Sequence, residues 1–458
     1  MTVSPEIRES MRTVEEYLKE DPRTPDALFE QAGEDPPLEP IPSAHYTSVE
    51  WQQREIDKLW KKSWQMACRE NDIPQPGDYT EYTIVGQTLI IVRQDDGSIK
   101  ALRNTCLHRG TALIEGAGSN SEFQCTFHGW TWKLDGSLKR VPCRWDFPKV
   151  SDGEFALPEV KVDTWQGFVF VNLDPDCEPL LDFVGPTLQR HFELWPLENR
   201  YKAVHVVKRI PCNWKVAMEA FMEDYHVFRT HAQMVGYAGD CNSQYDIFDG
   251  MHSRMITSMG VASPHLEDSY TAQDTVDSMI EDLVADVARE ADVKVEAPRI
   301  PEGATARNTL AGFMRASMKE RLGLDFSDKA DAEVLDAIQY QMFPNLIPWG
   351  GFSFPLVYRY RPAESPDWCW FDVMIMAPLP DGVPVPRDVP CTVLPSDEPW
   401  ANCAELGGLG PVYDQDMVNL PKVQRGMHND TMNELTMAQY QERNIRDFHR
   451  RLEAFLDR

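Results

Sequence analysis

The sequence predicts an α+β protein in two main parts, a small antiparallel β-domain followed by a larger half that combines a sheet with helices. The chain has 458 residues, which exceeds what one hydrophobic core usually supports, so at least two domains are expected. Short alternating runs between Asp-Gly turns occupy part of the first half. In the second half, apolar residues at helical spacing lie between further alternating runs.

Residues 1–45 are expected to form a short helix and a Pro-rich arm that packs on the larger domain. Val14, Tyr17 and Leu18 share one side of this helix. The N-terminal segment lacks the basic start and apolar core of a signal peptide. No stretch of the chain approaches the roughly 18 apolar residues of a membrane helix.

The net charge of −28 bears on partners. A field of this sign repels phosphate backbones and anionic lipid, which argues against nucleic-acid and membrane partners. Ten cysteines in a chain of this length are too sparse for a disulfide scaffold. We therefore expect reduced thiols, a cytoplasmic protein, and metal binding as the role of its notable cysteines.

The small β-domain is predicted over residues 46–175. We expect a helix from Asp57 to Met66 and then strands joined by tight turns, with the Asp-Gly pairs at 96–97 and 135–136 marking hairpins. The runs that predict strands are YTEYTIVG (79–86), TLIIVRQ (88–94), IKALRN (99–104), WTWKLDGSLKRVP (130–142) and WQGFVFVNL (165–173).

The larger half is predicted over residues 176–458, as a sheet with helices on one face. A helical insertion is expected over 262–341, with helices at 269–290, 304–323 and 329–341. The last thirty residues read as a polar helix with an apolar seam. Strand patterns appear in RYKAVHVVKRIPC (200–212), FSFPLVYRYRP (352–362) and WCWFDVMIMAPL (368–379).

Two cysteines and two histidines gather on the loops of the β-domain, as Cys106-x-His108 and Cys125-x-x-His128. Chance, a structural zinc and a redox cluster are the candidate explanations. A single buried Cys or His is more often core than ligand, but four in paired motifs can surround one centre. Cys₂His₂ is a zinc set, although zinc fingers usually pair like residues.

Each of these loops supplies one thiolate and one imidazole. This division suits a cluster of two irons, with two cysteines on one iron and two histidines on the other. Gly110 and Gly129 follow the motifs and would let the backbone approach the cluster sulfides. The residues therefore favour an iron–sulfur cluster over zinc.

A second group of ligand types lies in NWKVAMEAFMEDYHVFRTHAQ, which contains Glu223, Asp224, His226 and His231. A solvated helix face with two incidental histidines is the simple alternative. His226 and His231 are five residues apart, about 140° around a regular helix. One metal can hold both only if the helix ends or widens between them.

Two histidines and one carboxylate form the facial triad of non-haem Fe(II) oxygenases, which leaves positions open for O₂ and substrate. Glu223-x-x-His226 also matches half of a di-iron motif, but the chain has no second Glu-x-x-His. A remote carboxylate should complete the triad. The segment VYDQDMVNLPKVQRG offers Asp414 and Asp416.

The order of these motifs resembles the α subunit of Rieske non-haem iron oxygenases, of the aromatic-ring-hydroxylating dioxygenase type. The resemblance covers nearly the whole chain, and it implies a Rieske domain over 46–175 and a catalytic domain over 176–458 whose large antiparallel sheet is wrapped by helices. The segments that carry it are CLHRG, CTFHGW, NWK…EDYHVFRTH, FPN at 343–345, YRYRP at 358–362 and the late Asp segment.

The resemblance also implies two cofactors, a [2Fe–2S] cluster and a mononuclear Fe(II). Asp416, followed by Gln424 and Gly426, looks like the family's third-ligand helix, so Asp416 is favoured over Asp414. The implied ligands are Cys106 and Cys125 for one cluster iron, His108 and His128 for the other, and His226, His231 and Asp416 for the mononuclear iron.

The family is trimeric, and the cluster of one subunit serves the iron of its neighbour. A carboxylate three residues before the first histidine ligand bridges the two sites, which here implies Glu223, with His128 as its cluster partner and Asp224 as a second candidate. Ring-dihydroxylating members more often carry Asp at the bridge, and Glu-Asn-Phe where this chain reads Glu219-Ala220-Phe221. These departures leave the reaction outcome and the substrate open.

The function implied is a terminal oxygenase component that uses O₂ and electrons from an NAD(P)H-dependent reductase, directly or through a ferredoxin. It would hydroxylate an organic, aromatic substrate, and a β subunit is a further candidate partner. No Gly-rich dinucleotide fingerprint follows a strand, so the chain is not expected to oxidise NADH itself. The alternatives are a monooxygenase acting on a quaternary amine or as an N- or O-demethylase, and a non-catalytic electron-transfer or metal-binding protein.

Overall fold

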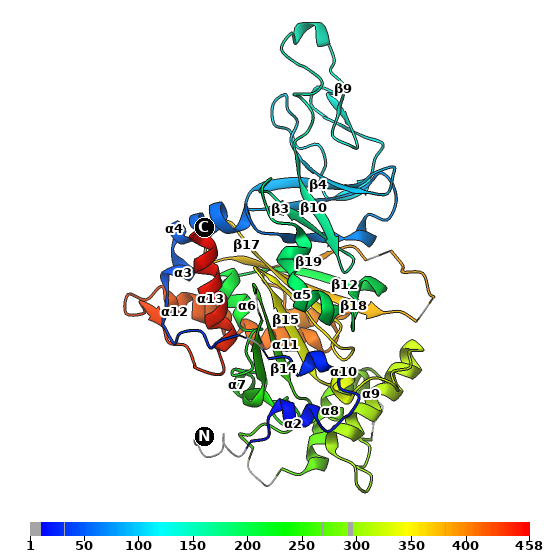
Figure 1. The fold of residues 1–458 in the computed structure, drawn as a ribbon, viewed down its shortest axis with the longest axis vertical. Coiled ribbons are helices and arrows are strands. Elements are labelled where there is room, and N and C mark those ends of the chain that lie inside the picture. The colour runs from blue at the N-terminus through cyan, green and yellow to red at the C-terminus, as the bar shows by residue number, and fades with distance from the viewer. Residues whose placement is uncertain are drawn as a thin grey trace.

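The computed structural model describes residues 11–31, 33–248, 250–266, 270–291, 296–380, 382–387 and 389–458. Two β-rich bodies lie along its long axis (Figure 1), and the smaller projects from the larger with β9 near its tip. Helices α8, α9 and α10 lie at the opposite end. The α+β class predicted from the sequence is confirmed. Among the described residues, no helix is long and apolar enough to cross a membrane.

The N-terminal helix forms as α2, Val14–Leu18. It begins with a capping box, in which the Thr13 hydroxyl accepts from the backbone N–H of Glu16 and the Glu16 carboxylate accepts from the backbone N–H of Thr13. The first ten residues of the predicted 1–45 segment lie outside the described residues.

The arm that follows α2 is held on the larger body by hydrogen bonds to its backbone carbonyls. The guanidinium of the buried Arg254 donates to the carbonyl oxygens of Ala27, at 2.7 Å, and Glu30, at 2.8 Å. Further along, β1 (Ile41–Pro42) pairs with β20 (Glu434–Leu435). The arm therefore ties the start of the chain to its C-terminal region.

The smaller body is a seven-stranded sheet in the order β2-β11-β10-β5-β4-β3-β6, with a three-stranded sheet β7-β8-β9 beyond it. Gly97 and Gly136 each have a φ of 85°, which supports the predicted Asp-Gly turns. The strands are β2 (Gln65–Arg69), β3 (Asp78–Ile84), β4 (Gln87–Arg93), β5 (Ile99–Arg103), β6 (Ala117–Ser119), β7 (Glu122–Gln124), β8 (Thr131–Lys133), β9 (Leu138–Arg140), β10 (Glu159–Trp165) and β11 (Phe168–Asn172).

The helix predicted from Asp57 to Met66 is misplaced. Helix α4 spans Val49–Glu55 and continues as a π-helical turn to Trp60. It begins early because the Ser48 side chain accepts a hydrogen bond from the backbone N–H of Trp51. The end of the predicted helix instead lies in β2, whose five residues are all buried against β11.

The larger body contains an eight-stranded sheet in the order β13-β14-β15-β16-β17-β18-β12-β19. Every pairing is antiparallel except that of β19 with β12, which is parallel. The strands are β12 (Arg200–Ile210), β13 (Gln244–Ile247), β14 (His252–Thr257), β15 (Ala337–Met342), β16 (Leu346–Pro348), β17 (Leu356–Pro362), β18 (Cys369–Pro378) and β19 (Thr392–Leu394).

The helix predicted over 329–341 is correct only in its first half. Helix α10 ends at Leu335, and Ala337–Met342 is strand β15 between β14 and β16. Ile338, Tyr340 and Met342 alternate with two glutamines, so the segment has the period of a strand, and pairing on both sides stabilises it. The helical insertion therefore lies between β14 and β15.

The helices differ in length from the sequence-based expectation. The predicted helix at 304–323 forms as α9, and the one at 269–290 forms as α8, although its residue 269 and the side chains of Val284 and Val287 lie outside the description. The C-terminal helix is shorter than predicted. The remaining helices are α3 (Ala44–Thr47), α5 (Leu180–Phe192), α6 (Trp214–Glu219), α7 (Val227–Thr230), α8 (Ala272–Ala291), α9 (Ala306–Leu322), α10 (Asp331–Leu335), α11 (Leu409–Met417), α12 (Leu420–Met427) and α13 (Arg443–Leu456).

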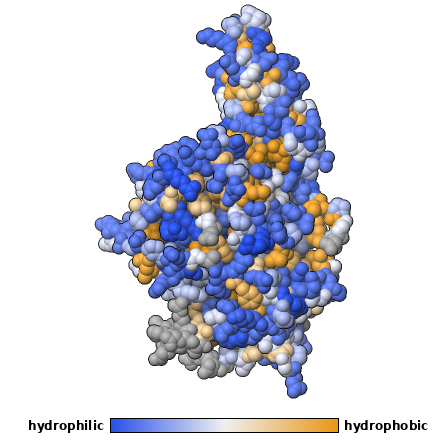
Figure 2. Space-filling model, viewed as in Figure 1, coloured by the Kyte–Doolittle hydropathy of each residue, from blue (hydrophilic) through white to orange (hydrophobic). Residues whose placement is uncertain are grey.

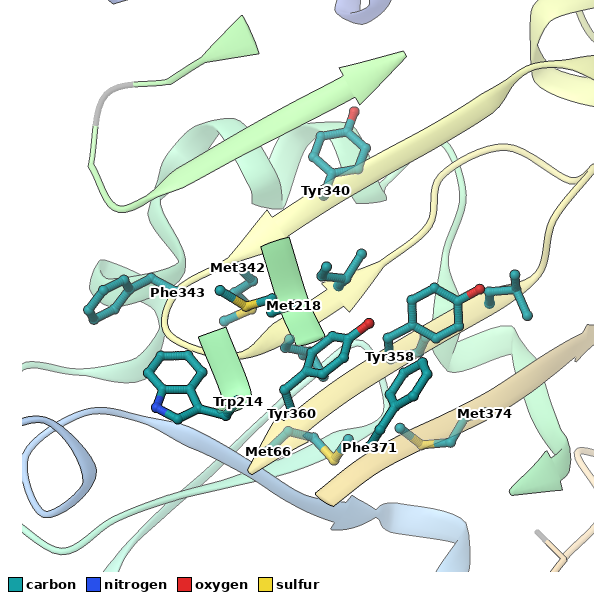
Figure 3. Close-up of a cluster of buried hydrophobic side chains, with 14 of the residues drawn as sticks. Met66, Trp214, Met218, Tyr340, Met342, Phe343, Tyr358, Tyr360, Phe371 and Met374 are labelled. Carbon is teal, nitrogen blue, oxygen red and sulfur yellow. The ribbon is translucent and has the colours of Figure 1, made fainter. Parts of the chain in front are cut away.

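One hydrophobic core continues from the smaller body into the larger, although each body also has a separate apolar cluster. Figure 3 shows Met66 of β2 beside Phe371 and Met374 of β18, with the rings of Tyr358 and Tyr360 close by. The surface is mainly hydrophilic in the view of Figure 2, and apolar side chains gather where the smaller body meets the larger. This continuous core makes the orientation of the smaller body a property of the fold.

A buried arginine fastens the junction. Arg359 of β17 donates to the carbonyl oxygens of Met66, at 2.9 Å, and Ala67, at 3.0 Å. The same guanidinium lies 2.7 Å from Asp372, which also pairs with Arg361. These contacts give the YRYRP segment a structural role, since its first arginine joins both sheets.

We expect Arg359→Leu to lower the free energy of unfolding by about 3–5 kcal/mol. The variant removes a positive charge that pairs with the buried Asp372 carboxylate, and it removes the donor to two carbonyl oxygens of β2. Urea denaturation followed by circular dichroism measures this loss. Arg361→Leu is the matched control and should cost less, because Arg361 makes no hydrogen bond with β2 among the described contacts. Equal losses in the two variants would contradict the role of Arg359.

Candidate metal centres

The two Cys-His loops of the smaller body have the same local backbone. The N–H of Gly110 donates to the carbonyl of Cys106 at 2.8 Å, and the N–H of Gly129 donates to the carbonyl of Cys125 at 3.0 Å. Both glycines have a positive φ, 87° and 71°, a conformation that other residues rarely adopt. The structure thus brings the two motifs together as a pair of equivalent turns.

Each turn buries its cysteine and presents its histidine outward. Cys106 and Cys125 are 2% exposed and free of disulfides. Burial raises the pKa of the Cys106 thiol. Burial acts in the same direction on Cys125, but backbone N–H groups of Phe127 and His128 and the Cys106 thiol outweigh it, so the pKa of Cys125 falls below its ordinary value. The pair is thus suited to hold at least one thiolate.

The two histidines of these turns lie side by side. The ring centroids of His108 and His128 are 4.6 Å apart, and His108 stacks on Trp130 at 5.2 Å. Nδ1 of His108 is buried and has no hydrogen-bond partner among the described residues. An inward ring nitrogen without a partner, next to paired thiols, fits the sulfur and nitrogen donor set of a two-iron cluster.

The second group of ligands is built on α7, which lasts only one turn. His226 precedes the helix, and His231 ends it with φ −113° and ψ 56°, outside the helical region. This break meets the condition that the five-residue spacing imposed. The two Nε2 atoms come within 3.3 Å of each other, and the rings are inclined at 72°.

Asp416 of α11 completes this group. Its Oδ1 lies 3.1 Å from Nε2 of His231 and 3.7 Å from Nε2 of His226. Bonds of ~2.1 Å at right angles to one metal would separate donors by about 3 Å. The residues therefore fit a mononuclear iron bound on one face.

Asp414 is engaged elsewhere. Its carboxylate accepts from the backbone N–H groups of Trp400, at 2.8 Å, and Ala401, at 2.9 Å. It caps a short turn rather than facing the histidines. The geometry accordingly favours Asp416, as the sequence did.

Glu223 and Asp224 adopt different roles. Glu223 lies 2.7 Å from Nδ1 of His226 and also accepts from the backbone N–H of His226 at 3.0 Å. This contact places the proton on Nδ1 and leaves Nε2 free for a metal. Glu223 is therefore in position to connect His226 to a neighbouring site.

Asp224 makes no hydrogen bond with His226 among the described contacts. Its carboxylate accepts from the hydroxyls of Ser243, at 2.6 Å, and Thr257. Burial raises its pKa. The geometry argues against Asp224 as the bridge, because its carboxylate is committed to the interior.

Gln415 was missed by the sequence analysis. Its side-chain oxygen lies 2.6 Å from Nδ1 of His231, so it orients the second histidine as Glu223 orients the first. Nδ1 of His231 thus donates, and Nε2 is left free. The only sequence signal of such a role is its position beside Asp416, because the contact with His231 depends on the fold.

The carboxylates around His226 favour a positive charge at this site. Burial alone would lower the pKa of His226, but the charge and hydrogen bond of Glu223 and the charge of Asp416 raise it to about 9. The imidazole therefore attracts a proton strongly where a metal could bind instead.

A cavity of about 360 Å³ is lined by two of the three ligand side chains, those of His226 and Asp416. Three carboxylates, those of Glu219, Glu223 and Glu442, line it together with His226 and Asp416. The apolar part of the lining comes from Val216, Leu420, Val423, Met427, Leu435, Met437 and Ile445. The site thus combines open space, apolar walls and an acidic rim.

Helix α6 places one wall of this cavity. The Asn213 side chain caps α6 by accepting from the N–H of Lys215 at 3.0 Å, and the backbone N–H of Asn213 donates to Gln424 of α12 at 2.9 Å. This side-chain cap stabilises the start of α6. Through Gln424 it also links α6 to the helix that follows Asp416.

Two family descriptions match this chain. The Rieske [2Fe-2S] domain matches residues 63–151, and the ring hydroxylating alpha subunit (catalytic domain) matches residues 191–458. Because the second match spans more than half of the chain, the chain belongs to the ring-hydroxylating α-subunit family. Both predicted cofactor types are confirmed at this level, a [2Fe–2S] cluster for the first domain and mononuclear iron for the second.

Relatives include enzymes with two kinds of substrate. The chain is 33% identical over 196 residues to chlorobenzene dioxygenase subunit alpha of a Cupriavidus species, covering 42% of this chain and 44% of that protein. It is 31% identical over 194 residues to the carnitine monooxygenase oxygenase subunit of Acinetobacter baumannii, covering 42% and 52%. The matches span about half the length of these relatives.

Solved structures share the fold over nearly the whole chain. A quaternary ammonium Rieske monooxygenase superimposes with a TM-score of 0.63 at 17% identity, over 91% of this chain and 95% of that one. Naphthalene 1,2-dioxygenase from a Rhodococcus species gives 0.60 at 18% identity, over 91% and 94%. These likenesses establish the common architecture of both bodies.

We expect Asp416→Ala to weaken Fe(II) binding by more than ~100-fold, because even outer partners of metal ligands contribute 10- to 100-fold. Asp414→Asn should leave Fe(II) affinity unchanged, because Asp414 only caps backbone N–H groups. Titration of the iron-depleted protein with Fe(II), with the cluster absorbance as an internal control, measures both. The reverse order of effects would show that Asp414 is the ligand.

Proposed function

We propose that this chain is a terminal oxygenase component that uses O₂ and reductase-derived electrons to hydroxylate an organic substrate. The observation that carries the proposal is the triangle of His226, His231 and Asp416 beside a cavity. A triad on one face leaves coordination positions open toward that cavity. A purely electron-transferring or metal-binding protein would need no such space.

The proposed ligand assignment follows the donor sets. Cys106 and Cys125 hold one cluster iron, and His108 and His128 hold the other, while His226, His231 and Asp416 hold the mononuclear iron. When bound, the cluster supplies single electrons and the mononuclear iron supplies the positions for O₂. The protein orients the imidazoles through Glu223 and Gln415 and lines the reaction space with apolar side chains.

The arrangement of the two sites supports electron transfer between chains. The cluster loops belong to the projecting body, whereas α7 lies in the other body, away from the tip (Figure 1). Within one chain, the two sites therefore lie on different bodies. We infer a head-to-tail assembly, a homotrimer, in which His128 of one copy meets Glu223 of the next.

Surface chemistry supports the same assembly. Phe127 and Trp145 on the projecting body are 58% and 82% exposed, and large exposed aromatics are typical anchors of interfaces. The basic residues Arg109 and Arg140 are exposed nearby in the chain, whereas Glu223 and Glu442 line the cavity. The opposite charges suit contact between copies.

Two substrate classes remain candidates. The apolar walls suit an aromatic substrate, in line with the chlorobenzene dioxygenase relative. The carboxylate of Glu223 in the cavity wall suits a quaternary amine, in line with the carnitine monooxygenase relative. An NAD(P)H-dependent reductase or ferredoxin is the proposed electron donor; a β subunit, the cytoplasmic location and the boundaries at 45/46 and 175/176 stay predictions.

Oxygen uptake tests the proposed function. The purified protein, a surrogate reductase, NADH and a panel of arenes, aromatic acids and quaternary amines are combined, and products are identified by mass spectrometry. We expect an oxygenated product from one class, with the oxygen derived from O₂. No product from any class, in a protein loaded with both cofactors, would favour the non-catalytic alternative.

We expect Glu223→Gln to retain both metal centres and yet slow the transfer of electrons from cluster to iron by orders of magnitude. The amide keeps the size of the side chain but loses the charge that links His226 to the neighbouring cluster. Stopped-flow reoxidation of the reduced cluster measures the rate. Asp224→Asn is the matched control and should retain the rate; normal transfer in Glu223→Gln would remove Glu223 from the path.

A further inference from the structure

A carboxyl group at the cavity wall belongs to a buried hydrogen-bonded network that includes none of the proposed metal ligands. Glu219, the last residue of α6, lines the cavity with Glu223 and His226. Both of its carboxyl oxygens lie 3.0 Å from the Tyr46 hydroxyl, and Oε1 lies 2.7 Å from Nε2 of His449. One side of Glu219 thus meets the cavity, and the other meets a histidine of α13.

The network continues from His449 toward the surface. The rings of His449 and His45 stack with their centroids 6.0 Å apart. Nδ1 of each ring is buried without a hydrogen-bond partner among the described residues. Nδ1 of His45 lies 3.8 Å from Glu453, whose side chain is 50% exposed. Glu219, His449, His45 and Glu453 therefore form a line from cavity to solvent.

The charges around this line keep its members near neutrality. Burial raises the pKa of Glu219 to about 8, although the Tyr46 hydrogen bond and Lys215 oppose the shift. Burial lowers the pKa of His449 to about 3, with Lys215 acting in the same direction. Burial, followed by the charges of His449, Lys215 and Arg54, lowers the pKa of His45 to about 3.

The remaining charged neighbours fit this picture. Lys215 is itself committed to Glu55, at 2.5 Å, with both side chains buried. Glu442, at the start of α13, also lines the cavity, and burial raises its pKa. Burial also raises the pKa of Glu453, with Asp457 and Glu39 adding to the shift. At neutral pH, Glu219 thus holds a proton and the two imidazoles are neutral.

We propose that Glu219, His449 and His45 form a proton relay from Glu453 at the surface to the cavity beside the proposed iron ligands. The inference rests on the proposed function, because reduction of O₂ with hydroxylation consumes two protons. The O–H bond of Glu219 breaks toward an acceptor in the cavity, and its carboxylate then takes the proton on Nε2 of His449. The relay requires a water molecule between the two rings to carry a proton from His45 to Nδ1 of His449. His449 is then neutral again in its other tautomer, since one ring nitrogen can accept while the other donates, and the ring must turn over before a second proton passes.

An internal proton route is needed if a neighbouring copy covers the cavity in the assembly. Contact with the projecting body of a neighbouring copy would exclude bulk water from the acidic rim, so protons would need an internal route. A purely structural network would equally join α3, α6 and α13, but it would not require the two inner histidines to exchange protons. Proton exchange is therefore the property to measure.

Infrared spectroscopy of the assembled holoenzyme, without substrate, provides the test. We expect a carboxylic-acid band that vanishes as the pH rises through about 8 and is absent from Glu219→Gln. On mixing with D₂O, the band should shift at least ~10-fold more slowly in His449→Gln and His45→Gln than in the wild type. Glutamine can still donate to Glu219 but cannot pass a proton on.

His191→Gln is the control, since His191 is a fully buried histidine that bonds to Tyr340 outside this line; it should exchange at the wild-type rate. Absence of a Glu219 band at neutral pH, or wild-type exchange in both relay variants, would overturn the proposal. If circular dichroism shows that the relay variants are misfolded, Tyr46→Phe replaces them. Exchange should stay fast in this variant. Slow exchange in Tyr46→Phe would favour a structural role for the network. Failure of the proposed function would appear separately, as missing oxygenated product.

Discussion

Everything at the mononuclear site depends on ending α7 after one turn. A continuing helix would carry the His226 and His231 rings about 140° apart, and no single metal could use both. Instead His231 leaves the helical region, and the two Nε2 atoms come within 3.3 Å of each other. Asp416 then meets them from a different helix, so the site exists only when α7 and α11 are both held in place.

The rest of the larger body supplies that support. The cap at Asn213 fixes the start of α6 and reaches Gln424 on the helix after α11. The buried pair of Lys215 and Glu55 joins α6 to α4. Removing one partner of such a buried ion pair strongly lowers the stability of a protein. Motif residues far from the proposed iron ligands are thus explained by the positions they give to those side chains, and the N-terminal segment packs against the larger body.

The sequence was most informative where a chemical pattern repeats at short range. The Asp-Gly hairpins form as predicted, and the paired Cys-His motifs lie on equivalent turns. The five-residue spacing of His226 and His231 only set a condition, which the end of α7 at His231 meets. The choice of Asp416 over Asp414 came from a resemblance, and geometry supports it because Asp414 caps backbone groups. Strand β15 was read as a helix because its burial is set by neighbouring strands that lie far away in the sequence. Gln415 was invisible for a similar reason, since its role depends on a contact with α7.

The proposed function requires two iron centres with unlike ligands in this chain, one accepting electrons and the other facing a cavity. Iron and acid-labile sulfide analysis of the purified protein, combined with Mössbauer spectroscopy, tests it most directly. We expect a [2Fe–2S] cluster in which one iron has cysteine ligands and the other has histidine ligands, together with a separate high-spin Fe(II) that is lost in Asp416→Ala while the cluster stays. Zinc in place of iron at both sites, with no labile sulfide, would contradict it.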